Sequence, residues 1–193
     1  MIRLAFFIAI ASAWTAVLVV VGAYAGWTFV AMKQVGVTSL SDTALATIEP
    51  ALLSRYVGGQ ITRIPFEAVN ITSIFLPAIL ASLIGGRPLK SQQVGSMLWL
   101  HRGVLVVLAA AIWCAFVSVQ LGFKLNDASE QYWTAVVAHD ASATSIAKDA
   151  LDAVHGRAQS TYLSLVGLAT LSTVLGATLL TRRSALISRH EQQ

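Results

Sequence analysis

The sequence predicts an all-α fold: an integral membrane antiparallel four-helix bundle with additional amphipathic helices on its outer, periplasmic side. Two observations predict this fold. Four long stretches contain no Asp, Glu, Lys, Arg or His, namely Leu4–Met32, Ala68–Gly86, Gly103–Phe123 and Ala158–Thr181. Each meets or approaches the about 20 apolar residues that a helix needs to cross a bilayer. Apolar residues also form 56% of the 193-residue chain and charged residues only 11%, against about 25% charged residues in soluble domains.

Residues 4–32 form the first predicted span. A signal peptide is the alternative, because Arg3 precedes the apolar run and Ala23-Tyr24-Ala25 has the small-x-small form of a cleavage site. The run has 29 residues, however, whereas the apolar core of a signal peptide has about 7–15. The length favours a true span.

Residues 33–66 form the first outer connection, which is too long to be a turn. Its second half has apolar residues at helical spacing, which predicts an amphipathic helix: Leu45, Ile48, Leu52 and Tyr56. Pro50 should kink or divide this helix, because proline removes a backbone hydrogen bond. Gly58-Gly59 should end it before the second span, residues 68–86.

The third span is predicted at residues 97–123, because apolar residues precede its charge-free run. The second outer connection, residues 124–157, again shows helical spacing, and Asn126-Asp127 is a suitable cap for a new helix. A break is expected near His139–Ser142, after which the helix should continue without interruption into the fourth span, residues 158–181. The whole chain, residues 1–193, is expected to be a single membrane domain.

The basic residues predict the orientation of the bundle. If the four spans alternate in direction, seven basic residues and one acid lie on the side of the two termini, and six basic residues and eight acids lie on the other. Short cytoplasmic connections of membrane proteins are rich in Lys and Arg. We therefore expect a multi-pass protein of the bacterial inner membrane with both termini cytoplasmic. This distribution explains the net charge of +4 and argues against nucleic-acid binding.

Small residues recur at a spacing of four along every span, and such rows allow helices to pack closely in lipid. The rows are Ala5, Ala9 and Ala13; Ser73, Pro77, Ala81 and Gly85; Ala110, Cys114, Ser118 and Gly122; and Ala169, Thr173 and Ala177, with Gly22 and Gly26 as a GxxxG pair. They predict a compact bundle. The partners expected are the lipid bilayer and other membrane proteins, or a second copy of the chain.

Asp149, Asp152 and His155 are the candidate metal ligands. Their spacing of three places neighbouring members on one helix face, and a carboxylate three residues before a histidine can ligate a metal in helix bundles. Such sites take ligands from several helices, and here Glu67 and Glu130 would have to complete the set. A solvated, charged helix face is the alternative interpretation.

Two further groups of polar residues are candidate binding sites. Arg87, Lys90, His101 and Arg102 lie near the inner interface and could anchor the spans or contact lipid headgroups. Asn70 and Gln120 are the most polar residues within the spans. They could bind a quinone or a lipid headgroup, although hydrogen bonds between helices are the commoner use of such residues.

The chain contains no phosphate-binding loop, nucleophile elbow, HExxH or CxxC motif, and no cofactor is predicted. We expect a non-catalytic accessory, assembly or scaffold component of a membrane complex. One alternative is an enzyme or cofactor binder with its site at the outer face. The other is a lipid- or quinone-binding bundle.

Overall fold

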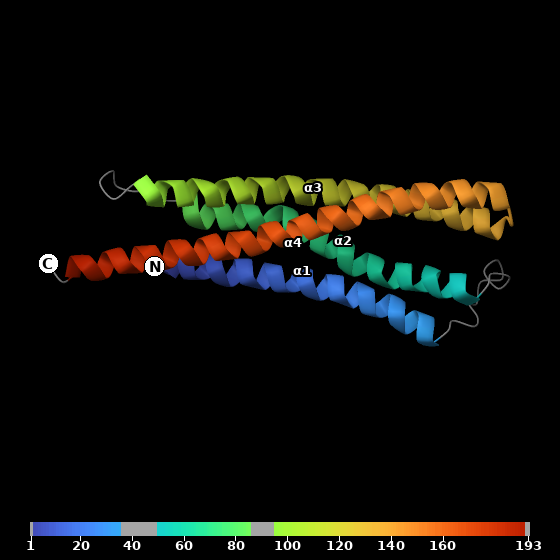
Figure 1. Cartoon of the computed structure of the whole chain (residues 1–193), viewed down its shortest axis with the longest axis horizontal. Coiled ribbons are helices and arrows are strands. Elements are labelled where there is room, and N and C mark those ends of the chain that lie inside the picture. The colour runs from blue at the N-terminus through green and yellow to red at the C-terminus, as the bar shows by residue number, and fades with distance from the viewer. Residues whose placement is uncertain (1, 36–49, 86–94, 192–193) are drawn as a thin grey trace. The chain divides into compact units, whose positions relative to one another are not determined.

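The computed structural model describes residues 2–35, 50–85 and 95–191, and within these ranges the chain forms four α-helices and no strand (Figure 1). The helices are α1 (Ile2–Val35), α2 (Pro50–Gly85), α3 (Gly95–Val137) and α4 (Ala141–Glu191). Each contains a segment that is long and apolar enough to cross a membrane. The all-α fold with four helices long and apolar enough to span a membrane is confirmed, whereas the additional amphipathic helices are not seen among the described residues.

The chain packs as two compact units, and each unit takes a segment from all four helices. Unit 1 consists of Met1–Leu18, Ile71–Phe116 and Tyr162–Gln193, and unit 2 consists of Val19–Asn70 and Val117–Thr161. The chain passes from unit 1 to unit 2 within α1 and α3, and it returns within α2 and α4. Consecutive helices therefore alternate in direction, and both ends of the chain belong to unit 1.

The core of unit 1 is a seam of buried side chains spaced alternately three and four residues apart. This spacing keeps a row of side chains on one face of a helix, as in coiled coils and four-helix bundles. On α1 the buried row is Leu4, Phe7, Ala11, Trp14 and Leu18, and on α4 it is Tyr162, Leu165, Ala169, Ser172, Gly176 and Leu179. The outward faces carry exposed apolar side chains instead, such as Phe6, Phe75, Val106 and Leu163.

The small-residue rows are only partly where they were predicted. Ser73, Pro77 and Ala169 are buried, but the predicted row Ala5, Ala9 and Ala13 on α1 is exposed, so the prediction that this row packs within the bundle is wrong. The reason is geometric. Four residues turn a helix by about 400°, so a strict spacing of four moves off the buried face by about 40° at each step.

One glycine in unit 1 allows two helices to come into close contact. A Cβ atom at Gly176 of α4 would overlap the aromatic ring of Phe7 on α1 and would touch Ile8. The ring of Phe7 is fully buried. Only a residue without a side chain fits at position 176, and the missing side chain makes room for the large ring.

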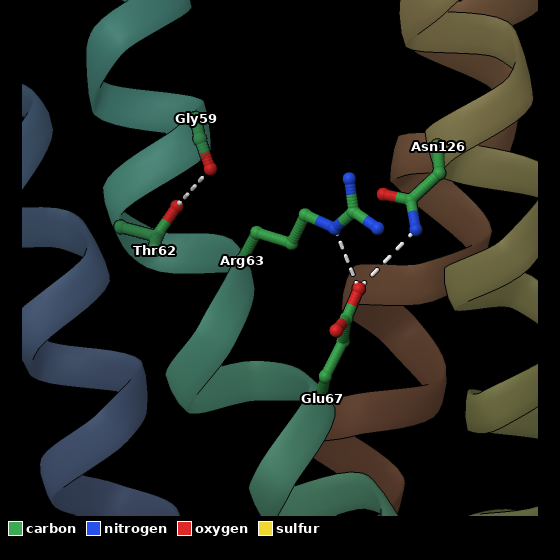
Figure 2. Close-up of polar contacts among 5 residues, drawn as sticks. All are labelled: Gly59, Thr62, Arg63, Glu67 and Asn126. Atoms are coloured by element: carbon green, nitrogen blue, oxygen red, sulfur yellow. Dashed lines mark hydrogen bonds and ion pairs between the residues drawn. The ribbon is translucent and has the colours of Figure 1, made fainter.

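The first outer connection differs from its prediction within the described residues. Pro50 is the first described residue of α2, so the predicted kink or division at this proline is not tested. Gly58 and Gly59 do not end a helix, because α2 continues through them to Gly85. Gly58 is buried against the Phe29 ring of α1, with carbons 3.1 Å from where its Cβ would be, so it serves helix packing. The Thr62 hydroxyl donates to the Gly59 carbonyl oxygen at 3.1 Å (Figure 2). The expected helix start near Leu45 lies outside the described residues.

The second outer connection is not a separate pair of helices either. α3 continues through Asn126 and Asp127 to Val137, so the predicted helix start there is wrong: the Asn126 side chain bonds to α2 rather than to its own backbone. The predicted break is confirmed, since α3 and α4 are separated by three residues that include His139 at φ 54°. Asp140 caps α4, its Oδ1 accepting the N–H of Ala143 at 2.9 Å. The continuous helix into the fourth span is also confirmed.

Candidate functional site

A polar cluster in unit 2 links α2 to α3. Nε of Arg63 donates to Oε1 of Glu67 at 2.6 Å, and Nδ2 of Asn126 donates to the same oxygen at 3.3 Å (Figure 2). The side chains of Arg63 and Glu67 are 49% and 46% exposed. Because water screens such a pair, it contributes at most about 1 kcal/mol to stability. The contact shows which parts of the two helices are neighbours: Glu67 of α2 lies beside Asn126 of α3.

Two further contacts give the register of the helices in unit 2. The Phe29 ring of α1 lies against Gly58 of α2, and the rings of Tyr56 and Trp133 meet edge to face with their centroids 5.1 Å apart. Gly58 precedes Glu67 by nine residues, which is about 13 Å along α2. The last turns of α1 therefore lie beside the start of α2 and the end of α3, about 13 Å along the helices from Glu67.

Between Val19 and Val30, α1 has an exposed surface without any charge. We call it the α1 face, and it consists of Val19, Val20, Ala23, Tyr24, Trp27 and Val30. Trp27 is 68% exposed, Val20 64% and Val30 56%. The other helices of unit 2 present charged or polar side chains instead, including Arg55 and Gln60 on α2 and Asp127 and Glu130 on α3, all of them exposed. In unit 2, α1 is therefore uncharged from Val19 to Val30, whereas the other three helices expose charged side chains beside apolar ones such as Ile64, Phe123 and Ile146.

The sequence predictions missed the α1 face. The first span is apolar on all sides, so its composition gives no indication of which residues face outward. One signal was available, however. The uncharged run of α1 has 29 residues, whereas the other three have 19, 21 and 24. When one helix has a longer uncharged segment than the helices packed against it, part of that segment lies beside their charged residues.

Asn70 and Gln120 do not face the same space. Asn70 is buried, and its Oδ1 accepts a hydrogen bond from the Ser118 hydroxyl of α3 at 2.9 Å. Gln120 is exposed on the surface of α3. Asn70 therefore has the interhelical role that is common for polar residues in membranes. The structure does not bring the two amides together into one binding site.

Asp149, Asp152 and His155 are all exposed on α4. Steps of three residues turn a helix by about 300°, so Asp149 and His155 point in directions that differ by about 120°. Among the described residues, no group of three or more His, Cys, Asp and Glu side chains is placed to hold a metal ion. The geometry gives no support to the metal hypothesis.

The candidate residues of the inner interface lie in unit 1. His101 of α3 is half-buried and lies close enough to Arg183 of α4 for a repulsive electrostatic interaction, and Arg102 is exposed. Arg87 and Lys90 lie outside the described residues. The structure thus brings together basic residues from two helices, and Arg183, which the sequence predictions did not single out, is one of them.

A shallow cavity of about 650 Å³ lies in unit 2, where α3 ends and α4 begins. Three carboxylates line it together with uncharged side chains: Asp127, Glu130 and Asp140, with Gln131, Thr134, Ala135, Ala138 and Ala143. Asp140 already caps α4. The cavity adds to the acidic character of unit 2.

Four helices that are each long and apolar enough to cross a membrane suggest that this chain is a multi-pass membrane protein. The chain matches no protein-family model, and no curated protein or solved structure is significantly similar to it. Its particular role has to be inferred from its own residues.

Proposed function

We propose that this chain is a non-catalytic accessory or scaffold component of a bacterial inner-membrane complex. In this role it binds an apolar membrane-spanning helix of another protein along the α1 face. Both termini would be cytoplasmic, as the basic residues at the ends of the chain favour. One observation carries the proposal: the α1 face stays apolar and exposed at a level where α2 and α3 are charged.

The energetics favour a covered α1 face. Apolar surface left in water costs about 25 cal/mol for each Å², and contiguous exposed apolar patches commonly mark interaction sites. The charged side chains of α2 and α3 at the same level require water. A partner helix lying along α1 would satisfy both requirements, because it would cover one helix and leave the other three hydrated.

The backbone of α1 is accessible to such a helix. Gly22 and Gly26 form a GxxxG pair beside the α1 face, and a Cβ at Gly26 would meet nothing within 4 Å. Small residues at this spacing let two helices approach closely in lipid. Trp27 and Val30 would then flank the contact as large apolar side chains.

The buried polar side chains of the described residues form hydrogen bonds within the chain. Trp14 donates its indole N–H to the Ser73 hydroxyl at 2.9 Å, and Ser118 donates to Asn70 at 2.9 Å. Among the described residues, no buried side-chain nitrogen or oxygen lacks a hydrogen-bond partner. These contacts support a structural rather than a chemical role for the interior.

Photo-crosslinking in native membranes tests the proposal. Benzoylphenylalanine would replace Trp27 on the α1 face, and in a matched control it would replace Trp113 on α3. The two side chains are 68% and 69% exposed. We expect position 27, but not position 113, to give a protein adduct of defined mass that mass spectrometry identifies. Lipid adducts alone at both positions would contradict the proposal, as would an adduct with a second copy of the 20.5 kDa chain.

A further inference from the structure

We propose that unit 1 binds the headgroup of an anionic phospholipid, in preference to a zwitterionic one, at its basic end. The basic end consists of Arg3 on α1, His101 and Arg102 on α3, and Arg182 and Arg183 on α4. This proposal is independent of the proposed partner at the α1 face, because it uses different residues in the other unit.

Among the side chains that the structure describes in unit 1, the basic end has no counter-charge. Every charged side chain that the structure describes in unit 1 is basic, and none of the described side chains of that unit is Asp or Glu. In unit 2, by contrast, Arg63 is paired with Glu67 at 2.6 Å. The described basic side chains of unit 1 are therefore available to an anion from outside the chain.

The fold brings these basic residues together from different helices. Arg183 of α4 is close enough to His101 of α3 for an electrostatic interaction with the protonated imidazole. Arg102 follows His101 and Arg182 precedes Arg183 in the sequence, and both arginines are exposed. Guanidinium groups attract anions and bind phosphate oxygens with paired hydrogen bonds.

The surface next to the basic end is suited to the acyl chains of a lipid. Trp99 is 73% exposed, Ile2 74% and Val106 68%, and they belong to the same helices as the basic residues. A free phosphate ion would use only the arginines. A phospholipid would use both surfaces, since its phosphate would meet the guanidinium groups and its chains would cover the apolar side chains. The combination favours a lipid as the ligand.

Native mass spectrometry of the full-length protein in detergent tests this proposal. Phosphatidylglycerol and phosphatidylcholine with identical acyl chains would be added in separate titrations. We expect tighter binding of phosphatidylglycerol to the unchanged protein. The double variant R102Q/R183Q should lose affinity for phosphatidylglycerol by about fivefold for each arginine removed, with little change for phosphatidylcholine.

Two further variants make the result specific. K148Q/R157Q removes the same charge from exposed positions of α4 in unit 2, and we expect it to bind phosphatidylglycerol as the unchanged protein does. R102K/R183K keeps the charge and should keep the preference for the anionic lipid. This variant still tests the proposal if the glutamine variant does not fold.

Three results would overturn the proposal. One is equal affinity of the unchanged protein for the two lipids. Another is an equal loss in the unit 1 and unit 2 glutamine variants, which would indicate a general effect of net charge. The third is complete displacement of phosphatidylglycerol by inorganic phosphate at equal concentration, which would indicate a site for small anions.

Discussion

Units 1 and 2 are built from the same four helices, yet their surfaces differ in kind. In unit 1 all four helices expose large apolar side chains, including Phe6, Phe75, Val106 and Leu171, and the described charges are basic and gathered at one end. In unit 2 the exposed charges have both signs and lie on α2, α3 and α4, whereas the exposed residues of α1 from Val19 to Val30 are uncharged.

This difference shows how the surroundings of a helix can be deduced from its outward side chains. Unit 1 has the surface expected of a segment surrounded by hydrocarbon, with apolar groups on every side. The surface of unit 2 is mixed, since α2, α3 and α4 expose charged side chains that require water, whereas α1 exposes no charge from Val19 to Val30. The contrast is the reason for placing a partner on the α1 face of unit 2 rather than on unit 1.

The largest effect is expected from a glycine substitution in the core of unit 1. Gly176→Ala would place a Cβ in the space of the Phe7 ring, and overpacking of this kind costs about 1–3 kcal/mol. We expect a clearly lower melting temperature in detergent, measured by circular dichroism.

Two other glycines provide matched controls for Gly176→Ala. Gly167→Ala on the same helix meets nothing within 4 Å and should be neutral or slightly stabilising, because alanine favours helices by about 1 kcal/mol over glycine. Gly58→Ala in unit 2 would lie 3.1 Å from Phe29 and should fall between the two. Equal melting temperatures for Gly176→Ala and Gly167→Ala would contradict the close contact between Gly176 and the Phe7 ring.

A smaller effect is expected from the buried hydrogen bonds of the two units. Ser73→Ala in unit 1 removes the acceptor of the Trp14 indole N–H, and Ser118→Ala in unit 2 removes the donor to Asn70. Hydrogen bonds between membrane helices contribute about 0.6 kcal/mol on average, so each variant should lose about that much. Double-mutant cycles with Trp14→Phe and Asn70→Ala measure the two couplings. A coupling near zero in either unit would assign that contact no role in holding the helices together.

The sequence predicted the fold because its main signal, four long runs without charge, does not depend on tertiary contacts. Local stop and start signals were less reliable. Gly58-Gly59 is a normal signal for a helix end, yet packing against Phe29 keeps it inside α2. Asn126 is a normal cap, yet its side chain reaches Glu67. In both cases a contact with another helix decided the outcome.

The site could be predicted only in part, for a related reason. The bond of Asn70 to a residue on another helix follows from its polarity at membrane depth. The neighbour of His101, by contrast, is Arg183, more than 80 positions later in the chain, and no sequence pattern links the two residues. The exposed side of α1 could not be predicted either, because an apolar helix has no polar face to mark its outside.

If a partner covers the α1 face, this face and the charged faces of unit 2 lie in different surroundings at the same level. Thiol labelling distinguishes these surroundings, with Trp27→Cys and Glu130→Cys made separately after Cys114→Ala has removed the native cysteine. A membrane-impermeant maleimide would be added to spheroplasts that contain the native partners. We predict rapid labelling at position 130 and little or none at position 27. Labelling of both positions at the same rate would contradict the claim.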